Sequence, residues 1–157
     1  MMGYYKNPAA TEKVIFERAG ARWLRTGDLG TVTEDGEFHV TGRLKRIFGA
    51  VGEQAAIFRV YPMAIDEVVC RCLGVARCGV VGLKDKERGY LSVVFMVPED
   101  WNGDRNALQR EILLLIRREL NDVSQPSAIH FLDSLPTTRA GKVDFTALEK
   151  LAQEMAE

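Results

Sequence analysis

Two residues that could act together in binding stand at the two ends of one short stretch. Asp28 precedes a run of β-branched residues, and Arg43 follows a second run in which apolar and polar residues alternate. The Glu-Asp-Gly sequence at residues 34–36 is a turn signal between the runs, so the stretch predicts a β-hairpin. A hairpin brings its open ends together, and we therefore expect Asp28 to lie beside Arg43.

A carboxylate acceptor beside a guanidinium donor fork can bind a vicinal diol such as the ribose of a nucleotide. The alternative is a local ion pair between Asp28 and Arg43 that only closes the hairpin. Short motifs have low specificity, and the spacing by itself favours the ion pair.

Four stretches, in this order, resemble motifs of the acyl-adenylate-forming enzymes. This superfamily includes acyl-CoA synthetases, fatty acyl-AMP ligases, luciferases and the adenylation domains of peptide synthetases. The resemblance covers nearly the whole chain, and four ordered motifs are far more specific than one. The stretches are residues 3–8 with Thr11, residues 26–30, residues 35–36 with residues 42–45, and residues 135–144.

The resemblance implies a reaction in two steps. A carboxylate attacks the α-phosphate of ATP to give acyl-AMP and pyrophosphate, and in many members a thiol of CoA or of a carrier phosphopantetheine then displaces AMP. Both steps gather negative charge in one place, so they need positioned cations and a dry site. The implied ligands are an acyl-chain carboxylic acid, ATP with Mg²⁺, and CoA or an acyl carrier protein, in lipid metabolism.

The resemblance also assigns roles to single residues. Lys142 matches the lysine whose ammonium bridges the carboxylate and the α-phosphate; an ordinary solvated loop lysine is the alternative. Asp28 and Arg43 match the residues that bind the ribose. Lys45 matches a hinge about which a lid domain rotates between the two steps, and a surface linker residue is its alternative. Gly52 matches the glycine of the loop that lines the pantetheine tunnel in thioester-forming members.

The sequence departs from the family pattern at several positions. Five extra residues, roughly 55–59, lengthen the loop after Gly52, which puts the thiol step in question. The other departures replace residues that are common in the family: Ala64 stands for glutamate, Thr137 for lysine, Ala140 for serine and Phe145 for arginine.

Composition limits the class of protein. With 157 residues and 46% hydrophobic residues the chain can bury a core, and its formal net charge of −1 gives no electrostatic case for a nucleic-acid partner. No apolar run is long enough to span a bilayer, and the start of the sequence lacks the apolar core of a signal peptide. The three cysteines suit a reducing cytoplasm, and buried thiols are favoured over a zinc site, so no metal site is expected.

Periodicity predicts the order of the elements. A helix begins at Pro8 and runs to about Phe16, and the hairpin follows. After a short strand at residues 46–48 and a loop at residues 49–53, the order is helix, strand, strand, helix, strand, helix. The later strands are predicted at residues 75–83, 91–97 and 128–132, and the helices begin at Pro62 and after the N-caps Asp104 and Asp144. The predicted core stripes are Ile65, Val68, Val69, Cys72 and Leu73; Leu108, Ile112, Leu115, Ile116 and Leu120; and Leu148, Leu151, Ala152 and Met155.

These elements predict an α+β fold: a small C-terminal lid domain of the adenylate-forming type, with a mixed three-stranded sheet and helices, preceded by a β-hairpin appendage. Residues 1–43 are expected to be the tail of an absent N-terminal adenylation domain, and residues 44–157 the lid.

The function expected from the sequence is that of a C-terminal fragment of an ATP-dependent carboxylate-activating ligase, inactive alone. The alternative is a non-catalytic module that docks a carrier protein or another partner through the helix rich in Arg110, Arg117 and Arg118. A hydrolase or transferase is disfavoured because the sequence supplies no Ser-His or Cys-His pair.

Overall fold

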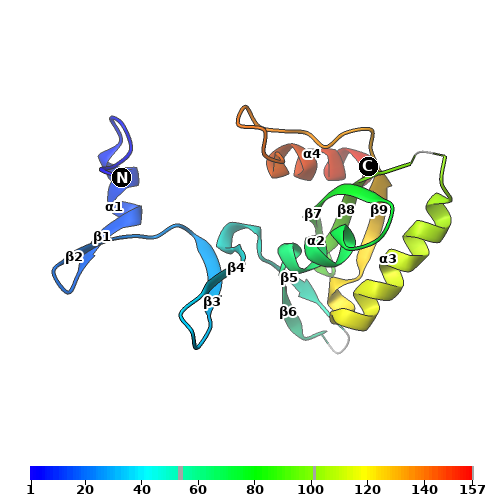
Figure 1. Ribbon diagram of the computed structural model, residues 1–157, viewed down its shortest axis with the longest axis horizontal. Coiled ribbons are helices and arrows are strands. Elements are labelled where there is room, and N and C mark those ends of the chain that lie inside the picture. The colour runs from blue at the N-terminus through cyan, green and yellow to red at the C-terminus, as the bar shows by residue number, and fades with distance from the viewer. Residues whose placement is uncertain (53–54, 101, 157) are drawn as a thin grey trace. The chain divides into compact units, whose positions relative to one another are not determined.

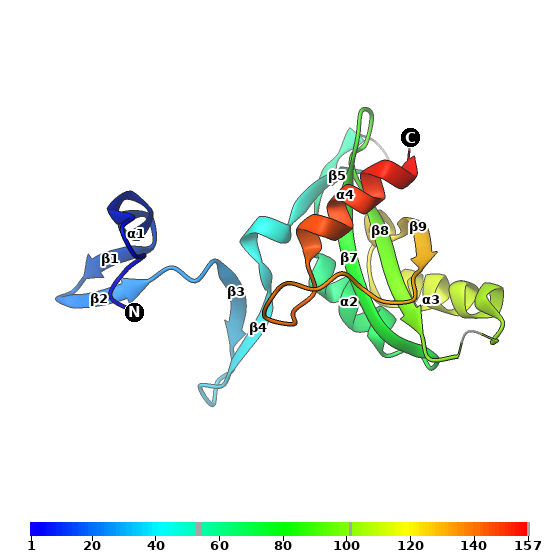
Figure 2. The same cartoon turned by 90° about the horizontal axis from the view of Figure 1, so that it is seen from above.

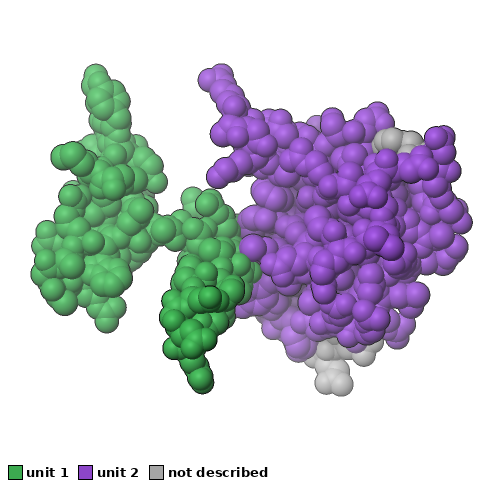
Figure 3. Space-filling model, viewed as in Figure 1, with its two compact units in different colours: residues 1–45 green, residues 46–157 purple. Residues whose placement is uncertain are grey.

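The structure is a computed structural model that describes residues 1–52, 55–100 and 102–156. The chain forms two compact units, residues 1–45 and residues 46–157, which Figure 3 shows in two colours. Within the described ranges, no helix has both the length and the apolar character that a membrane span requires.

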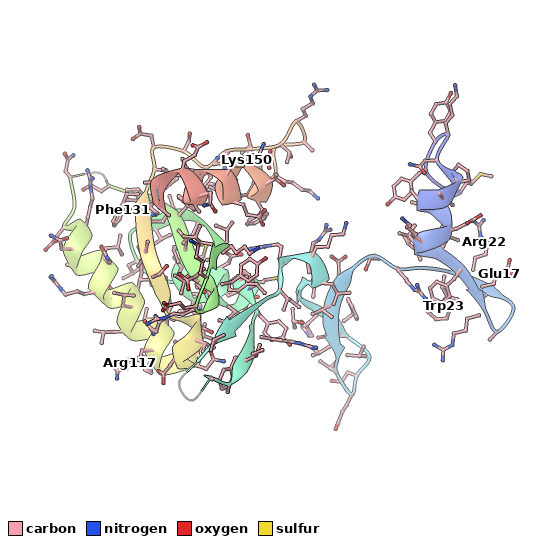
Figure 4. The ribbon with its side chains drawn as sticks, turned by 180° about the vertical axis from the view of Figure 1, so that it is seen from behind. Glu17, Arg22, Trp23, Arg117, Phe131 and Lys150 are labelled. Atoms are coloured by element: carbon pink, nitrogen blue, oxygen red, sulfur yellow. The ribbon has the colours of Figure 1, made fainter. Side chains whose placement is uncertain are left out.

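The first unit begins with a helix and a small hairpin. Helix α1 (Pro8–Val14) is capped by Asn7, whose side-chain oxygen accepts a hydrogen bond of 3.0 Å from the backbone N–H of Ala10. Strands β1 (Ile15–Arg18) and β2 (Ala21–Leu24) then pair antiparallel, with Glu17 opposite Arg22 (Figure 4). The predicted helix ended too late, at about Phe16, and this hairpin was not predicted, because strands of four residues give too short a pattern to identify.

The predicted β-hairpin is confirmed in strands β3 (Asp28–Val32) and β4 (Phe38–Arg43). Its register places Val32 opposite Phe38 at the turn and Asp28 opposite Arg43 at the open end. Gly36 has a φ of +84°, a conformation that glycine adopts without steric cost, and its N–H donates to the carbonyl of Thr33. The turn therefore sets which two residues meet at the far end.

The second unit is built on a mixed sheet of five strands, two more than the three predicted. The order is β6-β5-β8-β7, and β9 pairs parallel with β8; all other pairings are antiparallel (Figure 1). The predicted strand at residues 46–48 is only partly correct, because Arg46 ends the 3-10 helix η1 (Leu44–Arg46), whereas Phe48 begins β5. The strands are β5 (Phe48–Val51), β6 (Ile57–Val60), β7 (Val75–Asp85), β8 (Gly89–Pro98) and β9 (Pro126–Phe131).

Strands β5 and β6 escaped the sequence analysis for a physical reason. The predicted loop at residues 49–53 is partly strand β5, which contains Gly49, and three of the four residues of β6 are exposed. Neither strand shows an alternation of buried and exposed side chains that a pattern search would detect. Backbone pairing of β5 with β6 and β8 holds them in the sheet. Residues 53–54 lie outside the described residues.

Helices cover both faces of this sheet. Helices α2 (Pro62–Cys70) and α3 (Arg105–Glu119) pack on one face, and α4 (Phe145–Ala156) packs on the other (Figure 2). Strand β8 serves both layers because successive side chains point to opposite faces. Val94 and Met96 join the core under α2 and α3, while Val93 and Phe95 join the core under α4.

Most of the predicted core stripes are buried or half-buried, and the two expected N-caps are present. Asp104 accepts from the N–H of Ala107, and Asp144 accepts from the N–H of Ala147. The prediction of burial is wrong for two residues of the stripes: Leu73 is 87% exposed and Met155 is 50% exposed. Leu73 lies beyond the end of α2, so helical periodicity does not apply to it. Met155 lies in the last turn of α4.

Candidate active-site residues

Asp28 and Arg43 lie side by side at the open end of the β3–β4 hairpin. The Nε of Arg43 is 2.8 Å from Oδ1 of Asp28, and the Arg43 side chain is 65% exposed. Two local contacts hold this end: the N–H of Asp28 donates to Thr26 Oγ1, and the N–H of Leu44 donates to the carbonyl of Gly27. The structure thus contains the ion pair of the alternative interpretation, in an exposed position where a diol could reach both groups.

Lys45 is exposed in the 3-10 helix η1 and is the last residue of the first unit. The next residue, Arg46, is the first residue of the second unit and is held firmly there. Its Nη2 donates to Oδ2 of Asp66 at 2.8 Å and to the carbonyl of Val80 at 3.1 Å. Lys45 therefore directly precedes an anchored side chain.

The Arg46 anchor joins three elements of the second unit. Asp66 on α2 also accepts from the N–H of Val80 on β7 through Oδ1 at 2.8 Å. The guanidinium carbon of Arg46 lies 3.6 Å from the ring centre of Phe145 at the start of α4. Burial raises the pKa of the Asp66 carboxyl, and the Arg46 guanidinium acts in the opposite direction. The sequence analysis missed this cluster, since its members are far apart in the chain.

Lys142 lies on a tight turn before α4. The N–H of Gly141 donates to the carbonyl of Thr138, and the N–H of Thr138 donates to the carbonyl of Lys142 at 2.7 Å. Gly141 has a φ of +74°, which explains the glycine next to the lysine. The Lys142 side chain is exposed, and among the described residues its ammonium forms no salt bridge.

The turn carrying Lys142 is tied to the core at its base. Thr137 pairs with Val143 in an isolated antiparallel bridge, and the N–H of Asp144 donates to the carbonyl of Pro136 at 2.8 Å. Leu135 is buried under α4. The backbone of the turn is therefore fixed while the side chain of Lys142 stays free to reach a ligand.

Gly52 lies at a crowded position. A Cβ at this residue would lie 2.8 Å from Phe58 Cε2 and 3.1 Å from Val123 Cγ1, both shorter than ordinary contacts. Gly52 lines a hollow of about 500 Å³ whose polar residues include Arg88, Asp122 and Gln125. The residues predicted to be an insertion, 55–59, lie between β5 and the end of β6, and the last three of them belong to β6.

The cysteines differ from the expectation of buried thiols. Cys72 is buried, but Cys70 is exposed and Cys78 is half-buried. Cys70 is the last residue of α2, where the chain leaves the core layer. Within the described residues, no group of three or more His, Cys, Asp or Glu side chains could hold a metal ion.

Comparisons with known proteins identify the class to which this fold belongs. Residues 64–142, just over half of the chain, match the family described as the AMP-binding enzyme C-terminal domain. The chain belongs to this family. Its strands β7 to β9, helix α3, all of helix α2 except its first two residues, and the turn that ends at Lys142 fall inside the match.

Individual relatives extend the similarity to almost the whole chain. Feruloyl-CoA synthase of Amycolatopsis sp is 35% identical over 91% of this chain. The amide bond synthetase McbA from Marinactinospora thermotolerans is 32% identical over 96% of the chain, with a TM-score of 0.80. ATP-bound MatB from Rhodopseudomonas palustris is 25% identical over 99% of the chain, with a TM-score of 0.78. The chain spans only 27% of the feruloyl-CoA synthase and 29% of each solved structure.

Proposed function

We propose that this chain works as the C-terminal part of an AMP-forming acyl ligase, which activates a carboxylic acid with ATP and passes the acyl group to a thiol. The observation that carries the proposal is the exposed Lys142, held on a fixed turn of a domain that belongs to the AMP-binding enzyme C-terminal family. Relatives named as CoA synthases and ligases support the reaction class.

In the adenylation step, the Lys142 ammonium contacts the substrate carboxylate and an α-phosphate oxygen of ATP. A lysine supplies a compact point charge, which suits two oxygens that share a developing negative charge. The exposed side chain and the fixed backbone of the turn favour this role, because the Lys142 ammonium can reach the ligand without any part of the fold having to open.

Asp28 and Arg43 bind the ribose of the nucleotide in this proposal. The Asp28 carboxylate accepts hydrogen bonds from the ribose hydroxyls, and the Arg43 guanidinium donates to the same ring. Their ion pair places an acceptor beside a donor, as diol binding requires, and the strong exposure of Arg43 leaves it accessible.

Lys45 is the hinge about which the lid, residues 44–157, turns relative to residues 1–43, the tail of a larger adenylation domain. Two observations support this division. The chain separates into compact units directly after Lys45, and the first unit exposes many large apolar side chains that a larger domain would cover. Those side chains are Tyr4, Tyr5, Trp23, Leu24, Val32, Phe38 and Val40.

The thiol acceptor, CoA or a carrier phosphopantetheine, passes near Gly52. The absence of room for a side chain at this glycine and the adjacent hollow support that placement. The relatives differ in acceptor, since one is named a CoA synthase and another an amide bond synthetase. The lengthened β5–β6 hairpin is the feature of this chain that would select among acceptors.

ATP would bring Mg²⁺, but the described residues of this chain do not fit a metal site, as they contain no cluster of acidic or other metal-ligating side chains. We therefore assign Mg²⁺ to the rest of the ligase, and the proposal gives no residue of this chain a role in binding it.

The chain alone is expected to be inactive. Asp28, Arg43 and Lys142 could each contribute about 1.5–3 kcal/mol through charge-assisted hydrogen bonds, whereas association costs roughly 4–15 kcal/mol. AMP should bind the isolated chain no more tightly than about millimolar. Sub-micromolar binding in calorimetry would contradict this.

The test is a chimera in which this chain replaces the matching C-terminal part of feruloyl-CoA synthase. The chimera should restore ATP–pyrophosphate exchange with the acid that the parent activates, whereas the truncated parent should not. A folded chimera without exchange activity, in which the parent's own C-terminal part does restore it, would refute the proposal.

A docking module remains the second candidate because α3 carries a basic face with Arg110, Arg117 and Arg118, and Arg117 projects outward (Figure 4). Part of this charge is neutralised locally, as Arg118 and Arg71 both pair with Glu119. Binding of an acyl carrier protein that is lost in the triple alanine variant of these three arginines, combined with an inactive chimera, would favour the module over the ligase.

A further inference from the structure

Two cysteines of the second unit meet side chain to side chain. Cys70 is the last residue of α2, and Cys78 lies near the start of β7, where the two elements pack together (Figures 1 and 2). Their sulfur atoms are 2.7 Å apart, and both residues are free thiols. A disulfide bond is about 2.05 Å long, so closing this pair requires only a small movement.

The surrounding contacts hold the two cysteines in this arrangement. Asp66 lies one helical turn before Cys70 on α2, and its backbone carbonyl oxygen is 3.4 Å from the Cys78 sulfur. The Asp66 side chain accepts from the N–H of Val80 on β7. The end of α2 is therefore fixed against the strand that carries Cys78, and the pairing of the thiols follows from the packing.

The two thiols have different environments. Cys70 is exposed, and the hydrogen bond from the Cys78 thiol lowers the pKa of Cys70 to about 7. The same hydrogen bond, together with burial, raises the pKa of Cys78. A substantial fraction of Cys70 is therefore thiolate at neutral pH, whereas Cys78 keeps its proton beside it.

Cys72 provides a comparison within the same chain. It is buried, its sulfur lies 3.6 Å from the carbonyl of Val68, and burial raises its pKa. A protonated and inaccessible thiol reacts slowly with oxidants. Reactivity should therefore be confined to Cys70 and, through it, to Cys78.

We propose that Cys70 and Cys78 form a peroxide-sensitive dithiol site that converts reversibly into an intramolecular disulfide. The Cys70 thiolate attacks one oxygen of hydrogen peroxide, the O–O bond breaks, and Cys70 becomes a sulfenic acid while hydroxide leaves and takes up the proton that the Cys70 thiol released. The Cys78 sulfur then attacks the Cys70 sulfur and water departs. In total, two thiols and one hydrogen peroxide give one disulfide and two waters.

The cross-link would join the end of α2 to β7 next to Asp66, the residue that anchors Arg46. A small thiol reductant would reverse it by exchange at the exposed Cys70 sulfur. The inference concerns the chemistry of these two residues and is independent of the proposed ligase function.

The test oxidises the reduced 157-residue chain with one equivalent of hydrogen peroxide at pH 7, blocks remaining thiols under denaturing conditions, and maps the peptides by mass spectrometry. We expect loss of two hydrogens, a Cys70–Cys78 linkage, a blocked Cys72, and complete reversal by dithiothreitol. The Cys72→Ser variant should behave in the same way.

Every other result would overturn the proposal. These results are an unchanged mass, a Cys70–Cys72 linkage, a covalent dimer, or addition of two oxygens to Cys70 as a sulfinic acid while Cys78 remains a thiol. The Cys78→Ser variant keeps a hydrogen-bond donor and should fold. Its Cys70 should over-oxidise or dimerise, because no resolving thiol is present. If this variant still forms an intramolecular disulfide, Cys78 is not the partner.

Discussion

The guanidinium of Arg46 stacks on the ring of Phe145 at 3.6 Å and pairs with Asp66 at 2.8 Å. Arg46 follows the proposed hinge residue, and Phe145 follows the turn that carries Lys142 by three positions. One mostly buried side chain therefore connects the beginning of the second unit to the base of the Lys142 turn. Phe145 replaces an arginine common in the resembled family, and here it provides the surface on which Arg46 lies.

Replacing Arg46 with alanine should lower the free energy of unfolding of the chain by about 3–5 kcal/mol, the usual cost of breaking a buried ion pair. The loss arises mainly because the Asp66 carboxylate is left unpaired. Urea titration monitored by circular dichroism measures it. The Arg46→Ala/Asp66→Asn double variant should lose less than the sum of the single variants by about 0.5–3 kcal/mol. Strict additivity would mean that the pair is not coupled.

Replacing Lys142 with alanine in the chimera should slow pyrophosphate exchange roughly 10²–10³-fold, as expected for loss of one preorganised electrostatic donor. Lys150 offers a matched control: it is exposed on α4 (Figure 4), and its alanine variant should keep the parent rate. A reduction of less than about threefold for Lys142→Ala would leave no transition-state role for this lysine.

Replacing Lys45 with proline in the chimera should trap the lid in one of its two orientations, because proline fixes the φ angle about which the hinge would turn. One half-reaction should survive while the other falls. Pyrophosphate exchange and transfer from preformed acyl-AMP to CoA measure the two steps separately. Lys45→Ala keeps the backbone free and serves as the control, and normal rates for both steps in Lys45→Pro would exclude a hinge here.

Gly52→Ala should impair transfer to the thiol more than adenylation, since the added Cβ meets Phe58 at 2.8 Å and pushes into the wall of the adjacent hollow. Gly49→Ala is the matched control three residues earlier, in β5, where the added Cβ meets only Ile57 at 3.5 Å. Equal losses in both half-reactions would indicate general disruption of the fold. If neither half-reaction slows, Gly52 does not line the path of the thiol acceptor.

Alkylation of Cys70 by iodoacetamide should rise with pH and level off above an inflection near pH 7, because the thiolate fraction grows as pH passes the pKa of about 7. The Cys78→Ala variant removes the hydrogen-bond donor to the Cys70 thiolate, so the inflection should move to higher pH. The rate at pH 7 should then fall by roughly threefold to tenfold, allowing for the greater nucleophilicity of the more basic thiolate. An inflection unchanged by Cys78→Ala would show that Cys78 does not stabilise the thiolate.

The sequence by itself determined the local relationships. The position of the turn at residues 34–36 sets the register that brings Asp28 to Arg43, and helical periodicity located most of the residues of α2, α3 and α4 that face the core. The ordered motifs predicted the family that the comparison with known proteins confirmed. Each of these signals is carried by residues close together in the chain, where backbone geometry leaves few alternatives.

Only the tertiary structure decided which distant residues meet. Arg46, Asp66 and Phe145 come together, as do Cys70 and Cys78, because α2 packs on β7 while α4 covers the opposite face of the sheet. The same packing adds β5 and β6 to the sheet by backbone hydrogen bonds, and neither strand of four residues alternates between apolar and polar side chains. Contacts of this kind depend on how whole elements are layered, and the spacing of residues along the chain does not contain that information.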